Sequence, residues 1–111
     1  MPYVAPEHRQ ELDGLIDQLA GAILAQAQKA KYDAAFAGLL NYACTRLALQ
    51  IVRRRFGPMR YWIIALITGV FKNIGDEFYR RVAAPYENAQ MAKSGDVDLY
   101  REYVSEMEAG S

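Results

Sequence analysis

Positively charged and aromatic side chains gather in one short stretch, residues 77–87, which reads Glu-Phe-Tyr-Arg-Arg-Val-Ala-Ala-Pro-Tyr-Glu. Guanidinium groups fork onto phosphates and carboxylates, and tyrosine rings stack on bases. Glu77 and Arg81 are four residues apart, so they are expected to pair on one helix face, while Arg80 points elsewhere. Tyr79, Arg80 and Tyr86 would then form half of a binding site for an anion, a base or an acidic partner. The alternative is a well-paired structural joint at a helix end.

A second polar group lies within one turn of an otherwise apolar segment and comprises Asn41, Tyr42, Thr45 and Arg46. Tyr42 and Arg46 share a helix face because they are four residues apart. The functional interpretation is the wall of a pocket for an anionic, aromatic ligand, supported by Asn41 and Thr45. The structural alternative is an ion pair between Arg46 and Glu77 or Asp76, since a partly buried arginine needs such a partner. Both hold if the ion pair orients the arginine.

A secondary basic patch brackets the Gly57-Pro58 dipeptide and comprises Arg53, Arg54, Arg55 and Arg60, beside Tyr61 and Trp62. Single-stranded nucleic acid and nucleotides bind to arginines and aromatics of this kind. A solvated helix end is the more ordinary explanation. A nucleic-acid binder usually has a basic domain, and this chain has no net charge.

Net neutrality hides a strong segregation of charge. Residues 44–81 carry a net charge of +6, whereas residues 1–43 and 82–111 carry −2 and −4. The basic middle could bind anions, or the acidic tail could neutralise it in the same chain or in a neighbouring subunit. A domain of 111 residues buries a core with little to spare, which makes association into a homo-oligomer plausible.

Catalysis finds little support among the residues. His8 is the only histidine and Cys44 the only cysteine, and neither has a supporting third residue. There is no glycine-rich phosphate loop after a strand and no metal-binding motif, so we expect no enzyme, no cofactor and no metal. Acidic residues interrupt the N-terminus, and the longest apolar run, Tyr61–Phe71, is too short to span a bilayer. We therefore expect a cytoplasmic protein without membrane contact.

Apolar spacing predicts helices throughout the chain. The first begins near Pro6 and ends before Lys29, and the second begins at Asp33 as its N-cap and stops at Gly57-Pro58. The third is the longest, from about Met59 to Ala84, where Pro85 kinks or ends it. A short helix follows over 86–93, and a last amphipathic helix is capped by Asp96. The predicted fold is all-α: a small antiparallel bundle of three long helices (residues 1–95) with an acidic C-terminal arm (residues 96–111).

Several blocks of this sequence resemble a family of small proteins of bacteriophages and prophages. The blocks are Met1-Pro2-Tyr3-Val4 with Pro6 and Arg9, Leu40-Asn41-Tyr42 with Thr45-Arg46-Leu47, Tyr61, Gly69-Val70, Glu77-Phe78-Tyr79-Arg80-Arg81-Val82, Ala84-Pro85-Tyr86-Glu87 and Gly95-Asp96-Val97. The chain departs from the family pattern at Asn88, where a carboxylate is usual, and in its extension after Val97. The resemblance implies a phage context in a bacterial host and marks the site residues above.

The leading hypothesis is a non-enzymatic homo-oligomer that sequesters an anionic nucleotide-like ligand, such as a second messenger of bacterial immunity. Each subunit is too small to enclose a dinucleotide, so pockets are expected at subunit interfaces. The ligand-binding residues would be Tyr42, Arg46, Tyr79, Arg80, Arg81 and Tyr86, with Asn41, Thr45 and Glu77 in support. The alternative is a protein–protein interaction module, such as an inhibitor of a host protein or a small structural or regulatory phage protein. Nucleic-acid binding comes third.

Overall fold

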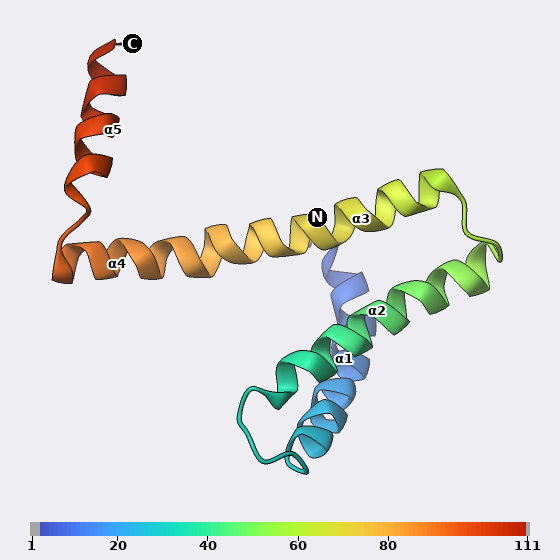
Figure 1. Ribbon diagram of the computed structural model, residues 1–111. Coiled ribbons are helices and arrows are strands. Elements are labelled where there is room, and N and C mark those ends of the chain that lie inside the picture. Colours follow the sequence, from blue (N-terminus) through green and yellow to red (C-terminus); the bar gives the residue numbers. More distant parts are fainter. Residues whose placement is uncertain (1–2, 111) are drawn as a thin grey trace. The chain divides into compact units, whose positions relative to one another are not determined.

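The protein is all-α, as predicted. The computed structural model describes residues 3–110, which form five α-helices and one π-helical segment and contain no β-strand (Figure 1). Met1 and Pro2, part of one resemblance block, lie outside the described residues. Along the chain the elements are α1 (Pro6–Ala27), α2 (Ala35–Arg55), α3 (Tyr61–Phe78), η1 (Tyr79–Ala83), α4 (Ala84–Ser94) and α5 (Asp98–Gly110).

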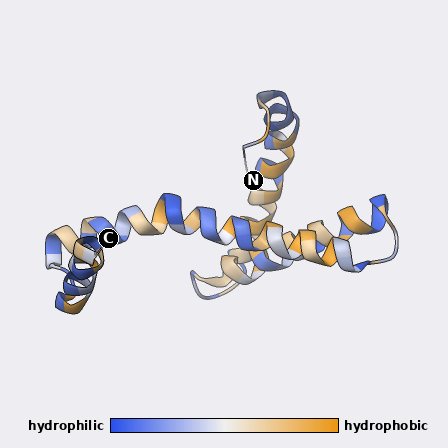
Figure 2. Cartoon of the chain, turned by 90° about the horizontal axis from the view of Figure 1, so that it is seen from above, coloured by the Kyte–Doolittle hydropathy of each residue, from blue (hydrophilic) through white to orange (hydrophobic). Residues whose placement is uncertain are grey.

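The chain divides into two compact units between Phe71 and Lys72, within α3. The first unit contains α1, α2 and the beginning of α3. The second unit contains the rest of α3 with η1, α4 and α5. The predicted boundary after residue 95 coincides with the break between α4 and α5 and stays a prediction. Within each helix, hydrophobic residues lie between hydrophilic ones, as amphipathic helices require (Figure 2).

The first unit is built on a hairpin in which α1 and α2, joined by a short loop, contact each other over part of their lengths (Figure 1). Pro6 occupies the first turn of α1, as predicted, because proline is pre-shaped for that position and needs no hydrogen bond there. The prediction of Asp33 as the N-cap of α2 is wrong. The N-cap is Ala34, which provides no side-chain hydrogen bond, and the N–H of Ala37 donates to the Ala34 carbonyl oxygen instead (3.0 Å).

The end of α2 follows the sequence prediction closely. Arg53 to Arg55 occupy the last turn, where positive charge suits the negative end of the helix dipole. Gly57 has φ +81°, a left-handed conformation that favours glycine. Its N–H donates to the carbonyl oxygens of Val52 (3.1 Å) and Arg53 (3.2 Å). The chain then turns into α3, which begins at Tyr61, two residues after the predicted start at Met59.

Burial is sparse and confined to the first unit. Among residues 3–110, the buried hydrophobic side chains are Ala35, Val52 and Ile63. The Phe56 ring meets the Trp62 ring edge-on, with centroids 5.1 Å apart, and so ties the end of α2 to the start of α3. Most other large apolar side chains of α1 and α2 stay about half exposed. The hairpin therefore covers only part of the apolar surface that its sequence supplies.

Pro85 was predicted to kink or to end the long helix, and the second unit shows that it does not end it. Helical turns continue from α3 through η1 into α4, with Pro85 in the first turn of α4. The N–H of Ala84 donates to the carbonyl oxygen of Tyr79, five residues back, which is the π-helical pattern. A proline ring clashes with the carbonyl four residues before it and offers no N–H. The wider π turn ahead of Pro85 gives that ring room, so the helix passes through.

Gly95 separates the last two helices. It has φ +86°, and its N–H donates to the carbonyl oxygen of Met91 (2.9 Å), which closes α4. The carboxylate of Asp96 accepts the N–H of its neighbour Val97 (2.7 Å) rather than one inside α5, so the predicted capping role of Asp96 is wrong. Asp98 in the first turn of α5 provides the negative charge that this helix end favours.

Candidate functional site

Tyr42 and Arg46, the α2 half of the predicted site, line an open cavity on the first unit. This arginine-lined cavity has a volume of about 330 Å³ and lies between the second half of α2 and the turn that follows it. Its lining comprises Tyr42, Thr45, Arg46, Leu49, Gln50, Val52, Arg53, Gly57 and Met59. No carboxylate is among these residues, so nothing in the wall neutralises its two guanidinium groups.

Periodicity explains why these side chains meet. Residues spaced by three and four along α2 stand on one helix face. Among them, the Thr45 hydroxyl donates to the backbone carbonyl oxygen of Asn41 (2.8 Å). Its proton is therefore used by the helix itself, and the hydroxyl keeps only acceptor capacity. The predicted polar pair of Asn41 and Thr45 forms through the Asn41 backbone, and the amide side chain takes no part in that bond.

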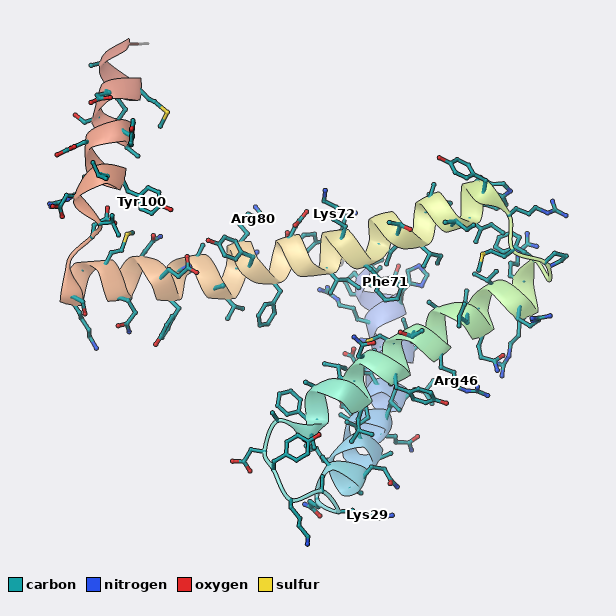
Figure 3. All side chains as sticks on the ribbon, in the orientation of Figure 1. Lys29, Arg46, Phe71, Lys72, Arg80 and Tyr100 are labelled. Atoms are coloured by element: carbon teal, nitrogen blue, oxygen red, sulfur yellow. The ribbon has the colours of Figure 1, made fainter. Side chains whose placement is uncertain are left out.

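Arg46 projects from α2 (Figure 3) and has no ion pair within the first unit. The predicted pair with Glu77 or Asp76 would join the two units and stays a prediction. Inside the second unit the Glu77 carboxylate already accepts from Arg80. A guanidinium with no carboxylate beside it in its own unit retains its full attraction for an external anion.

A second depression, the α1–α2 groove, runs along the hairpin on another side of α2. It has a volume of about 520 Å³ and shares Tyr42, Arg46 and Gln50 with the cavity. The rest of its lining is largely apolar: Leu19, Ala22, Ile23, Gln26, Leu39, Ala43, Leu47, Ile51 and Arg54. Arg46 and Arg54 are its charged groups, and no carboxylate accompanies them.

In the second unit, the Tyr79 hydroxyl donates to Oε2 of Glu87 (2.9 Å). This hydrogen bond, then the negative charge of Glu87 and a little desolvation, raises the pKa of Tyr79 above its usual value. Sequence reasoning did not assign a role to Glu87. The eight-residue separation was a usable signal, because it is close to two helical turns. The π segment that lies between the two residues could not be read from spacing.

Arg80 pairs with Glu77, three residues before it, as a salt bridge in which Arg80 stays about two-thirds exposed. The prediction that Arg80 points away from Glu77 is wrong, because helix positions three apart are neighbours as well as positions four apart. Arg81 also has a partner. Tyr86 is 65% exposed on α4. The second unit thus brings Tyr79 to Glu87 and Arg80 to Glu77, and the carboxylates hold the predicted binding groups in place.

The secondary basic patch is partly structural. The Arg55 guanidinium lies over the Phe56 ring, 4.9 Å from its centre, and Phe56 in turn contacts Trp62. This cation–π stack stabilises the turn after α2 and uses one arginine of the patch. Arg53 and Arg54 face the cavity and the groove respectively.

Among residues 3–110, no group of three or more His, Cys, Asp or Glu residues could hold a metal ion. Within residues 3–110, one helix, α2, has the length and apolar composition needed to cross a membrane. The core helix of a soluble protein can have the same length and composition. Arg46 lies in the middle of α2, where a bilayer would penalise a charged side chain by about 2.5–3.5 kcal/mol.

Residues 1–97 match a family that carries the description Domain of unknown function (DUF6899). The chain belongs to this family. The match includes the cavity, the groove and the Tyr79–Glu87 segment, and it ends just before α5. No curated protein and no solved structure matches the chain.

Proposed function

We propose that the protein is a non-catalytic, homo-oligomeric binding protein that holds an anionic, nucleotide-like ligand at Tyr42 and Arg46. One observation carries the proposal. Arg46 and Arg53 line the same cavity, and no carboxylate is present in its wall. Unneutralised arginines attract a ligand that brings the missing negative charge, and phosphate fits the guanidinium fork best.

The other lining residues suit the rest of a nucleotide. Tyr42 offers an aromatic ring, 63% exposed, on which a base can stack. Gln50 and the acceptor side of Thr45 can hydrogen-bond a sugar or a base edge. A volume of about 330 Å³ is near the lower limit for small-molecule sites, which span roughly 300–1,000 Å³. The cavity would therefore hold part of a dinucleotide, and a second subunit would supply the remaining wall.

Homo-oligomerisation is supported by the exposed apolar surface of the first unit. Leu47 and Ile51 on α2 are each 55% exposed although they follow the apolar stripe of the sequence. The predicted antiparallel three-helix bundle would be completed when another copy covers this stripe. Burial in such an assembly supplies the hydrophobic stabilisation that a single hairpin lacks.

Residues of the second unit would provide the other half of the site in this assembly. The Glu77 carboxylate orients the Arg80 guanidinium, and the Glu87 carboxylate orients the Tyr79 ring. Arg80 and Arg81 would contact phosphates, and Tyr79 and Tyr86 would stack on bases. In a bacterial host infected by a phage, such a protein would act in the cytoplasm as a sponge for an immune second messenger.

A protein–protein interaction module is the second candidate, and the α1–α2 groove favours it. An apolar groove between two helices, with arginines in its wall, is suited to an amphipathic helix with acidic residues. In this case the partner would be a host protein, and the cavity arginines would serve only to steer it.

A thermal-shift screen of the purified full chain tests the proposal. The probes are cyclic di- and trinucleotides, ADP-ribose isomers and short single-stranded DNA. A ligand at 100 times its dissociation constant adds about 2.7 kcal/mol, which raises the melting temperature by several degrees for a domain of this size. Recovery of the bound ligand unchanged would support a binding role without turnover.

Matched substitutions assign the site. Arg46→Glu should remove the shift, whereas Arg9→Glu on α1, outside both depressions, should preserve it. Circular dichroism checks that both variants stay helical. Loss of the shift in both variants would point to a general charge effect, and retention in Arg46→Glu would refute the assignment. No shift with any nucleotide, together with stoichiometric capture of one host protein, would favour the interaction module.

A further inference from the structure

We propose that α5 of a second copy docks into the α1–α2 groove, so that the acidic arm of one subunit covers the arginines of another. This inference rests on the proposed homo-oligomer and names its interface. It also gives a partner to a helix whose large apolar side chains are exposed. Tyr100 projects from α5 (Figure 3), and Tyr100, Tyr103 and Met107 are each more than 60% exposed.

Charge complementarity selects the groove. The only charged residues of α2 are Arg46, Arg53, Arg54 and Arg55, which gives the helix a net charge of +4. The α5 helix has a net charge of −3, because Asp98, Glu102, Glu106 and Glu108 outnumber Arg101. Arg46 and Arg54 have no ion pair among residues 3–110, so both can bind carboxylates from another chain.

The two surfaces also match in pattern. On α5 the apolar residues Tyr100, Val104 and Met107 follow the three-and-four spacing of one face. Asp98, Glu102 and Glu106 follow one another at four-residue steps along a neighbouring strip of the helix. The groove repeats this arrangement, with apolar side chains between the helices and Arg46 and Arg54 two turns apart. An amphipathic helix laid in the groove would therefore bury apolar groups and form ion pairs at the same time.

The helix α4, which precedes α5 in the second unit, is a poor alternative partner. Its sequence, APYENAQMAKS, provides Tyr86 and Met91 as its large apolar side chains and no apolar stripe. The groove shares Tyr42, Arg46 and Gln50 with the arginine-lined cavity, and the rest of its lining is different. A docked α5 would thus form a wall beside the cavity, where its carboxylates would compete with an anionic ligand for Arg46, while Arg53 lines only the cavity and stays open to the ligand.

The first test measures the mass of the full chain by light scattering. Glu102→Lys with Glu106→Lys reverses the charge of α5 and should shift the assembly toward single chains, by at least tenfold in dissociation constant. Glu7→Lys with Glu11→Lys makes the same change in net charge on the first turns of α1 and should leave the assembly intact. An unchanged mass in the α5 variant, or an equal loss in both variants, would overturn the proposal.

A disulfide test distinguishes the possible occupants of the groove. In a Cys44→Ser background, Ala22→Cys is placed in the groove and Val104→Cys on the apolar face of α5. Oxidation should give disulfide-linked dimers, and a reducing agent should convert them back to single chains. A bond within one chain, or no bond at all, would overturn docking to a second copy.

Nucleotide binding measured in parallel separates the two proposals. If the nucleotide shift fails and the dimer forms, the ligand assignment is wrong and the interface stands. If the nucleotide binds and the mass does not respond to α5, the interface assignment is wrong and the binding function stands.

Discussion

The two units of this chain have similar amphipathic helices but are stabilised in different ways. In the first unit, α1 and α2 contact each other, and the buried side chains of the described protein are found there. In the second unit, no side chain of residues 72–110 is buried, and the specific contacts are local: Arg80 with Glu77 and Tyr79 with Glu87. Burial stabilises the first unit, whereas helix propensity and short-range polar contacts maintain the second.

The comparison also bears on function. The first unit offers two shaped depressions whose arginines have no carboxylate partner, while the second pairs the predicted binding residues with carboxylates of their own helix. An arginine that is already paired with a carboxylate of its own helix contributes less to binding, because an external anion must compete with that carboxylate. The first unit is therefore the stronger candidate for primary ligand contact.

The largest expected effect contrasts two isoleucines of α3. Ile63, in the first unit, is 2% exposed, whereas Ile74, in the second, is 57% exposed. Ile63→Ala should destabilise the protein by about 2–5 kcal/mol, because it leaves a cavity. Ile74→Ala should change stability by about 0.5 kcal/mol or less. Denaturant unfolding followed by circular dichroism measures both. An equal cost at Ile74 would reveal that another copy covers the second unit.

The next largest effect contrasts two prolines: Pro85, which lies in the first turn of α4, and Pro58, which lies in the turn after α2. Pro85→Ala should raise helicity and stabilise the second unit by about 1–3 kcal/mol, since a proline inside a helix costs about 3 kcal/mol and the π turn relieves part of it. Pro58→Ala lies in the turn after α2 and should not raise helicity. Far-ultraviolet circular dichroism and thermal melting give the comparison. A loss of stability in Pro85→Ala would mean that the π turn is favoured for another reason.

A smaller effect is expected at the two glycines with positive φ, one in each unit. Gly57→Ala should cost about 1–2 kcal/mol, because alanine is strained at φ +81° although an added Cβ meets no atom within 4 Å. Gly95→Ala should carry a similar local strain but should leave the melting of the first unit unchanged. Gly69→Ala, within α3 and equally open, should be neutral or stabilising. Loss of stability at all three would contradict an origin in backbone conformation.

The smallest effect concerns Tyr79. Because Glu87 raises the pKa of Tyr79, the stabilisation from their hydrogen bond is present below pH 10, the usual tyrosine value, and is lost as the pH rises through the higher folded value. Glu87→Gln removes the charge and should move the ionisation of Tyr79 to lower pH. An alkaline titration of tyrosinate absorbance measures the shift, and Tyr79→Phe identifies which step belongs to Tyr79. A titration identical in Glu87→Gln would show that the hydrogen bond does not persist in solution.

Much of the helical pattern was predictable because it depends on local chemistry. Pro6 marks the first turn of α1, and Gly57-Pro58 and Gly95 mark helix ends, since backbone conformation is limited residue by residue. The predictions failed where two local signals competed. Asp33 and Asp96 are good capping residues, yet the N–H of Ala37 donates to the backbone carbonyl of Ala34, and the Asp96 carboxylate accepts the N–H of Val97 rather than one inside α5. At Pro85 a π turn removed the clash on which the predicted end of the helix depended.

The candidate site was half predictable for a similar reason. Spacing by four placed Tyr42 and Arg46 together, and they share the wall of one cavity. Spacing did not reveal that Arg53 lies with them, because the cavity depends on the left-handed turn at Gly57. It also did not identify Glu87 as the partner of Tyr79, because the π segment shifts the register between them.

The sequence by itself determined that this protein is helical, where most helices begin and end, and how its charge is divided along the chain. These properties follow from single residues and their near neighbours. Only the tertiary structure decided which side chains are buried and which residues of α1 and α2 meet. It also decided that the α1–α2 hairpin has arginines without partners in its wall. Such properties depend on distances between residues far apart in the sequence, and the packing of one helix on another sets those distances.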